Sequence, residues 1–131
     1  MTRWILVFML LYTVVGLPSQ GEEDDNIDVR TTDKPLIEGI LSYAKSIKGS
    51  PLPPRNDLVF ILDSSSAVGG QRNFRSLQIF TQRLVSEFSV SSSTTRVGVI
   101  LCSSHPYLHF GLDKFVNREC TLKAVRNASM V

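Results

Sequence analysis

Five consecutive apolar residues, 58–62, lie between two aspartates, Asp57 and Asp63. A strand with one face in water alternates apolar and polar residues, whereas a strand covered on both faces is apolar throughout. The run therefore predicts a strand of a parallel sheet that is buried on both faces. A second run of this kind, residues 97–102, predicts a neighbouring strand.

The residues between these two runs have the spacing of a helix. Apolar residues recur at helical intervals over about 72–88, after a serine- and glycine-rich loop at 64–70. Strand, helix and strand form one right-handed crossover unit. An edge-like strand over 107–112 and a helix from about 121 to 130 follow. This order predicts an α/β fold.

The first 21 residues have the features of a secretory signal peptide. Arg3 supplies a positive charge, residues 4–15 are apolar, and small residues follow. The apolar run is shorter than the roughly 20 residues of a membrane span, and acidic residues follow it closely. We expect cleavage after Gly21, with cuts after Gly16 or Ser19 left open, and a secreted, extracellular chain without a membrane span.

Residues 22–55 are expected to precede the α/β domain. Residues 22–32 are acidic with few apolar side chains, which predicts a flexible leader. Residues 35–48 have the pattern of an amphipathic helix that packs on a neighbouring domain rather than on an anionic membrane surface. The proline-rich linker at 49–54 ends this helix, and we place the domain boundary there, with the α/β domain at 56–131.

The charge pattern does not indicate binding to nucleic acid. The net charge is +2, and the basic residues after position 58 are dispersed, without a cluster or interleaved aromatic residues. We therefore expect no nucleic-acid partner.

Cys102 and Cys120 are the two cysteines of the chain. An oxidising compartment would allow a disulfide between them, but Cys102 ends an apolar run, which favours a buried free thiol. Their pairing stays open.

The loop after the first apolar run carries the candidate chemistry. Asp63 and Ser65 present oxygens two residues apart, which suits a hard cation such as Mg²⁺, but Ala67 has no oxygen at the next such position. A serine before a helix also commonly caps backbone amides, and we favour this structural role over a cation site. A nucleophilic serine lacks the Gly-x-Ser-x-Gly context and a recognisable base, since His105 and His109 are expected to be ordinary surface residues.

Residues 58–69, with 73–75 and 95–99, resemble the opening of a von Willebrand factor type A (VWFA) domain. The likeness covers 56–131 and is strongest to the amino-terminal domain of large secreted matrix proteins built from sushi and epidermal-growth-factor modules. It implies a doubly wound, Rossmann-like α/β sandwich, here truncated to about its first half, strand-helix-strand-strand-helix.

The resemblance also implies a metal-ion-dependent adhesion site, with Asp63 and Ser65 as its first two ligands. Ala67 replaces the serine that the family has next, and the remaining threonine and aspartate would lie beyond Val131. The Mg²⁺ site is therefore expected to be incomplete. In the family strand order, 3-2-1-4-5-6, the half 3-2-1 alone would leave the central strand 1 with an unpaired edge. Such an edge predicts aggregation. We therefore expect a fragment, a splice product or an incomplete gene model.

These observations predict a secreted, non-enzymatic adhesion or protein-interaction module of the VWFA class that binds an extracellular protein. One alternative is a truncated product that neither binds nor folds stably alone, and a less favoured one is a secreted serine hydrolase. Asn127 begins an Asn-Ala-Ser sequon, which predicts N-glycosylation in a secreted chain.

Overall fold

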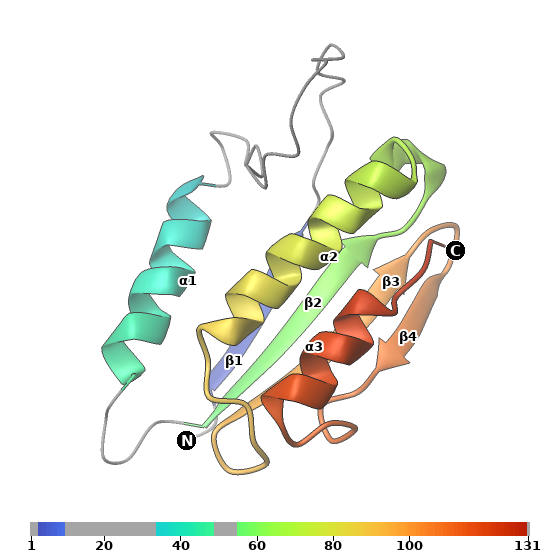
Figure 1. Cartoon of the computed structure of the whole chain (residues 1–131). Helices are drawn as coiled ribbons and strands as arrows, with labels where there is room; N and C mark the ends of the chain where they lie inside the picture. The colour runs from blue at the N-terminus through green and yellow to red at the C-terminus, as the bar shows by residue number, and fades with distance from the viewer. Residues whose placement is uncertain (1–2, 10–33, 49–54, 131) are drawn as a thin grey trace.

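The computed structural model describes residues 3–9, 34–48 and 55–130 of the chain (Figure 1). Its elements in chain order are β1 (Arg3–Met9), α1 (Lys34–Ile47), β2 (Asn56–Asp63), a short 3-10 turn η1 (Ser66–Val68), α2 (Gln71–Ser86), β3 (Thr95–Cys102), β4 (Pro106–Phe110) and α3 (Arg118–Arg126). The strands form one mixed sheet in the order β1-β2-β3-β4. β1, β2 and β3 run parallel, and β4 is antiparallel to β3.

This architecture confirms the predicted α/β fold, and the elements from β2 onward follow the expected order. The largest error in bounds is at α3, which begins at Arg118 rather than near residue 121 and ends at Arg126. The Asn117 side chain accepts a hydrogen bond from the Cys120 amide, at 2.9 Å, and so caps the helix one turn earlier than the apolar pattern indicates.

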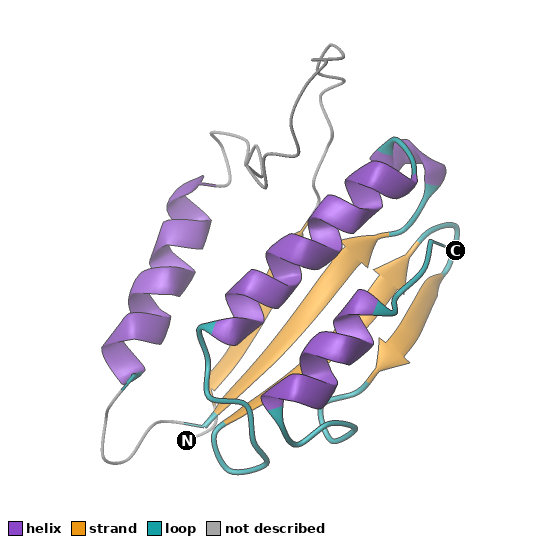
Figure 2. Cartoon of the chain, viewed as in Figure 1, coloured by secondary structure: helices purple, strands orange, loops and turns teal. Residues whose placement is uncertain are grey.

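The core lies between the sheet and the helices α2 and α3, which lie side by side across it (Figure 2). Alternate residues of the two central strands are buried there, with their helix partners: Leu58, Phe60, Leu62, Val97, Val99, Leu101, Phe74, Leu77, Val85 and Val125. The intervening residues Val59, Ile61 and Ile100 are only half-buried. The prediction of burial on both faces was therefore wrong for the described residues, because a continuous apolar run does not reveal which face the helices cover.

Polar contacts between α2 and α3 fix how these two helices pack. The Gln78 amide nitrogen lies 2.6–3.2 Å from the carbonyl oxygens of Val125, Arg126 and Ala128. A second amide, from Gln82, donates to the carbonyl of Leu122 at 2.9 Å. The buried Gln78 and the half-buried Gln82 thereby join α2 to backbone carbonyls in and just after the last turns of α3.

The amphipathic helix α1 packs on the α/β unit, as its pattern predicted. Ile40 and Ala44 are buried in the same core as the sheet residues. The Tyr43 hydroxyl donates to Asn56 Oδ1 at 2.7 Å, which ties α1 to the start of β2. None of the helices that the structure describes combines the length and the apolar character needed to cross a bilayer.

The edge of β2 is paired, which corrects the expectation of an open edge. β1 pairs with β2 from Arg3↔Asn56 to Met9↔Leu62. These are residues for which the sequence predicted a signal peptide, and an apolar run rich in branched and aromatic side chains also favours a strand. The acidic leader at 22–32 and the proline-rich linker at 49–54 lie outside the described residues.

Candidate functional site: the Asp63 loop

The candidate loop, called the Asp63 loop below, consists of residues 63–70 and connects the end of β2 to the start of α2. Ser64 holds it against β3, because its amide and its hydroxyl both donate to the Cys102 carbonyl, at 2.8 and 3.2 Å. Gly69 and Gly70 then adopt positive φ angles of 88° and 98°, a region that side-chain-bearing residues rarely occupy. These two residues reverse the chain so that α2 can return across the sheet.

Asp63 and Ser65 are brought together as the sequence predicted. Asp63 Oδ1 accepts from the Ser65 amide at 2.9 Å and from the Ser65 hydroxyl at 2.6 Å. The Ser65 oxygen also accepts from the Ala67 amide at 3.3 Å and is the N-cap of η1. Ser65 therefore has the capping role that the sequence favoured.

The donor set does not fit a complete magnesium site. Mg²⁺ requires near-octahedral coordination by six oxygens. At the positions that the resemblance assigns, the loop offers one carboxylate, from Asp63, and one hydroxyl, from Ser65, and the exposed Ala67 adds only a methyl group. Within residues 3–9, 34–48 and 55–130, no group of three or more His, Cys, Asp or Glu side chains could hold a metal ion.

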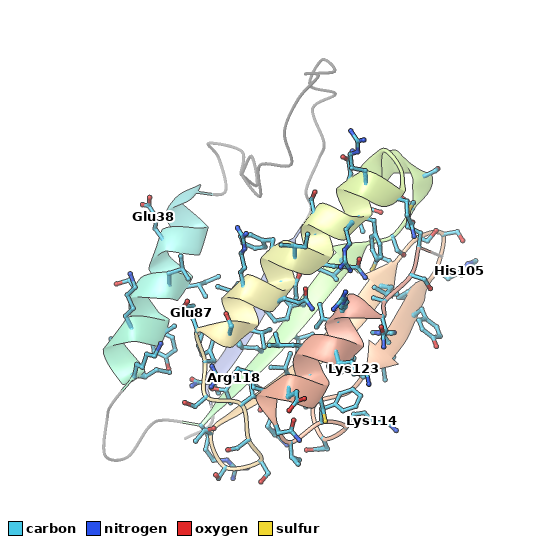
Figure 3. The ribbon with its side chains drawn as sticks, in the orientation of Figure 1. Glu38, Glu87, His105, Lys114, Arg118 and Lys123 are labelled. Atoms are coloured by element: carbon cyan, nitrogen blue, oxygen red, sulfur yellow. The ribbon has the colours of Figure 1, made fainter. Side chains whose placement is uncertain are left out.

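A second polar segment lies at the same edge of the sheet. Asp63 and Cys102 are register partners at the ends of two parallel strands, so the turn after β3 emerges beside the Asp63 loop. This turn carries Ser103, Ser104 and His105, and Ser104 Oγ lies 3.3 Å from His105 Nδ1. Figure 3 shows His105 at this end of β3 and β4. The proximity of this turn to the Asp63 loop was not predicted from the sequence, although two neighbouring parallel strands necessarily end at one edge.

The two histidines differ from each other. His105 is exposed, as expected. His109 is half-buried, and its Nε2 lies 2.9 Å from the Ala124 carbonyl, so the prediction of a surface residue was wrong there. Because a carbonyl only accepts, this nitrogen carries the proton and ties β4 to α3.

The hydroxyls of Ser64 and Ser65 are engaged away from any histidine. Ser64 Oγ donates to the Cys102 carbonyl, and Ser65 Oγ donates to the Asp63 carboxylate. A nucleophilic serine needs a base within hydrogen-bonding reach. Neither hydroxyl has a histidine as its partner, so these contacts lend no support to the hydrolase alternative.

Cys102 and Cys120 are both free thiols. Cys102 is half-buried at the end of β3, whereas Cys120 is exposed in the first turn of α3. Figure 1 places the start of α3 at the opposite end of the sheet from the end of β3. The disulfide that the sequence left open is therefore not formed in this fold.

The predicted glycosylation sequon lies at an accessible position. Asn127 is the C-cap of α3, and its side chain and that of Ser129 are exposed. Glycosylation at Asn127 stays a prediction for a secreted chain.

The other end of the sheet carries an ion-pair network that the sequence analysis missed. Arg96 donates to both oxygens of Asp57, at 2.7 and 2.8 Å, and to Asp113 at 2.8 Å. The hydrogen bond to Asp57, followed by that to Asp113, raises the pKa of the Arg96 guanidinium above its ordinary value. An acid at the start of one parallel strand and a base at the start of the next were the available signal, since Asp57 and Arg96 are register partners.

The mixed α/β sheet with the Asp63 loop at its carboxyl edge indicates the class of protein, and the chain belongs to the von Willebrand factor type A family. The model of that family, "von Willebrand factor type A domain", matches residues 57–130. The chain is similar to human vitrin, with 36% identity over 95 residues that cover 72% of the chain and 14% of vitrin. It is also similar to mouse von Willebrand factor A domain-containing protein 2, with 31% identity over 107 residues that cover 79% of the chain and 13% of the relative.

A solved structure supports the fold. Proximal thread matrix protein 1 from the mussel byssus matches with a TM-score of 0.55 and 22% identity, over 60% of this chain and 21% of that chain. Another structure of that protein has a zinc-occupied metal-ion-dependent adhesion site (MIDAS) motif. The chain thus spans a small part of these proteins, and its relatives, which include collagen chains, indicate an interaction module of the extracellular-matrix type.

Proposed function

We propose that this chain is a secreted adhesion module that binds an extracellular protein through the carboxyl edge of its sheet. The contact surface consists of the Asp63 loop and the turn at residues 103–105. The chain has no catalytic role in this proposal and no nucleic-acid partner.

The position of the Asp63 loop is the observation that carries the proposal. Ligands of open α/β sheets bind outside the carboxyl ends of the strands, where loops leave the sheet. The backbone of the loop is fixed by Ser64, while Ser66, Ala67 and Gly69 are exposed at its apex. A rigid base with an exposed apex suits protein recognition, because little conformational freedom is lost on binding.

A pair of matched variants tests this surface. Ala67→Glu places a charge on the loop apex, and Lys114→Gln makes the same change of net charge at the opposite end of the sheet (Figure 3). The full chain is applied to a decellularised fibroblast matrix, and bound chain is quantified. We expect Ala67→Glu to weaken binding several-fold and Lys114→Gln to leave it unchanged. Equal binding by both variants, or no binding by the unsubstituted chain, would refute the proposed surface.

Secretion is tested separately at the amino terminus. The signal-peptide pattern predicts a mature terminus between Leu17 and Glu22 in the medium of expressing cells. Amino-terminal sequencing of the secreted chain gives this directly. Retention of Met1 in a membrane pellet would argue against export.

A second candidate is a product that neither binds nor folds stably alone. It is favoured by one observation: the edge of β2 is covered by residues 3–9, which signal cleavage would remove. A urea unfolding curve of the secreted chain separates the candidates, because a cooperative transition with a measurable slope requires a packed core.

A further inference from the structure

The outer edge of β2 is covered by a segment from the far amino terminus. All seven residues of β1 have register partners in β2, in parallel orientation, and the central pair is Leu6↔Val59. Between these strands the chain passes through α1 (Figure 1). β1 therefore completes the sheet from outside the region that matches the family model, residues 57–130.

The β2 edge has a strong physical requirement for a partner. An edge strand presents a row of unpaired N–H and C=O groups, and these readily pair with another extended chain. β2 is apolar from Leu58 to Leu62, and the side chains of Leu58, Phe60 and Leu62 are fully buried. Water reaching this edge would therefore meet both free backbone groups and the margin of the core.

The segment that fills this edge has a second predicted role, and the two roles exclude each other. Residues 3–9 lie within the predicted signal peptide, so cleavage near residue 21 would remove β1 entirely. The rest of the fold has its own supports, because α1 is held by Ile40 and Ala44 in the core and by the Tyr43–Asn56 hydrogen bond. Cleavage of the signal peptide would leave an open strand position beside a core that remains anchored.

We propose that the outer edge of β2 is a strand-acceptor site. Residues 3–9 fill this site in the unprocessed chain, and cleavage of the signal peptide opens it to a strand of another polypeptide. The strand that fits is extended, at least as long as β1, free of proline, apolar and parallel to β2. Backbone hydrogen bonds provide the affinity in such strand addition, and the side chains select the register. The inference is independent of the proposed binding surface, which lies at the ends of the strands and not along their edge.

Disulfide trapping in the full chain tests the pairing. Leu6→Cys and Val59→Cys are combined in a chain that also carries Cys102→Ser and Cys120→Ser. The matched control combines Leu6→Cys with Ile61→Cys, which shifts one thiol by two residues, about 6.6 Å along the strand. Register partners come within the Cα separation that a disulfide needs, whereas the shifted pair does not. We expect rapid, nearly complete cross-linking of the first pair and several-fold less of the second. Equal yields, or no cross-link in either chain, would overturn the pairing.

Strand addition in trans tests the acceptor site itself. Leu6→Pro with Val7→Pro removes two amide donors from β1 and should release it from β2 in the full chain. The probe is a fluorescent peptide with the sequence of residues 3–9 and added terminal lysines for solubility, and its control is a scrambled peptide. We expect the peptide to bind the proline variant and to protect β2 amides from hydrogen exchange, with far weaker binding to the unsubstituted chain.

Binding of the native and scrambled peptides to equal extents would overturn the proposal, as would failure of the native peptide to bind a variant that circular dichroism shows to be folded. If the proline variant does not fold, the cross-linking yields alone decide whether residues 3–9 occupy the edge.

Discussion

Two aspartates mark the ends of the central strand β2, and their surroundings differ. Asp57, at the amino end, has a side chain that is only 1% exposed and binds Arg96 through both oxygens. Asp63, at the carboxyl end, is half-buried and receives its two hydrogen bonds from Ser65, two residues away. One carboxylate thus joins distant parts of the chain, and the other organises only its own loop.

The difference separates the structural end of the sheet from the end available for binding. At the amino end, contacts cross from α1 to β2 through Tyr43 and Asn56, and from β2 to β3 through Asp57 and Arg96. Arg96 also reaches Asp113, whose side chain is 86% exposed. At the carboxyl end, the only partner of the Asp63 side chain among the described residues is the nearby Ser65, which leaves the carboxylate accessible to another molecule.

Exchange of either aspartate for alanine tests this division and should produce the largest effect. Asp57→Ala removes the buried partner of a charged group, so we expect the midpoint of thermal unfolding to fall by about 5 °C or more. Asp63→Ala removes only local contacts and should lower it by roughly 2 °C. Scanning calorimetry of the full-length variants measures both. Equal shifts would show that the two ends do not differ in this way.

A smaller effect is expected where α1 meets the amino end of β2. Tyr43→Phe deletes the hydroxyl that donates to Asn56 and should reduce the free energy of unfolding by about 1 kcal/mol. The control is Ser46→Ala, because the exposed Ser46 hydroxyl donates only within α1, to the Tyr43 carbonyl. Urea unfolding measures both changes. A Tyr43→Phe variant as stable as the control would mean that α1 is not part of the cooperative unit.

Sequence patterns predicted the helices and strands of this fold better than the pairing between them. The apolar runs located β2 and β3, and the helical spacing located α1 and α2, because both signals are local. Residues 3–9 were assigned only to a signal peptide, since a signal h-region and a buried strand have the same apolar composition. The partner that distinguishes these possibilities, β2, lies about fifty residues away along the chain.

In the candidate site, too, the residues within one loop were predicted, and the contacts between strands were not. Asp63 and Ser65 were recognised because they are two residues apart, and the missing oxygen at Ala67 could be read directly. The proximity of the turn at residues 103–105 and the Asp57–Arg96 pair both depend on the register between β2 and β3. Register is a tertiary property, so neither followed from patterns within one segment.

The smallest expected effect concerns cations at the carboxyl end. We expect the chain to bind Mg²⁺ with a dissociation constant of about a millimolar or weaker, because few protein oxygens compete with the tightly held hydration shell of the ion. Ala67→Ser restores a hydroxyl to the loop but should leave this affinity unchanged, since Asp63 and Ser65 would still supply the only other ligands. The same alanine-to-serine substitution in a complete domain of the family should tighten Mg²⁺ binding. Calorimetric titration of the chain and of its Ala67→Ser and Asp63→Ala variants makes the comparison. Micromolar binding by the unsubstituted chain, lost in Asp63→Ala, would show that the carboxyl end holds a cation through Asp63 together with further oxygens besides that of Ser65.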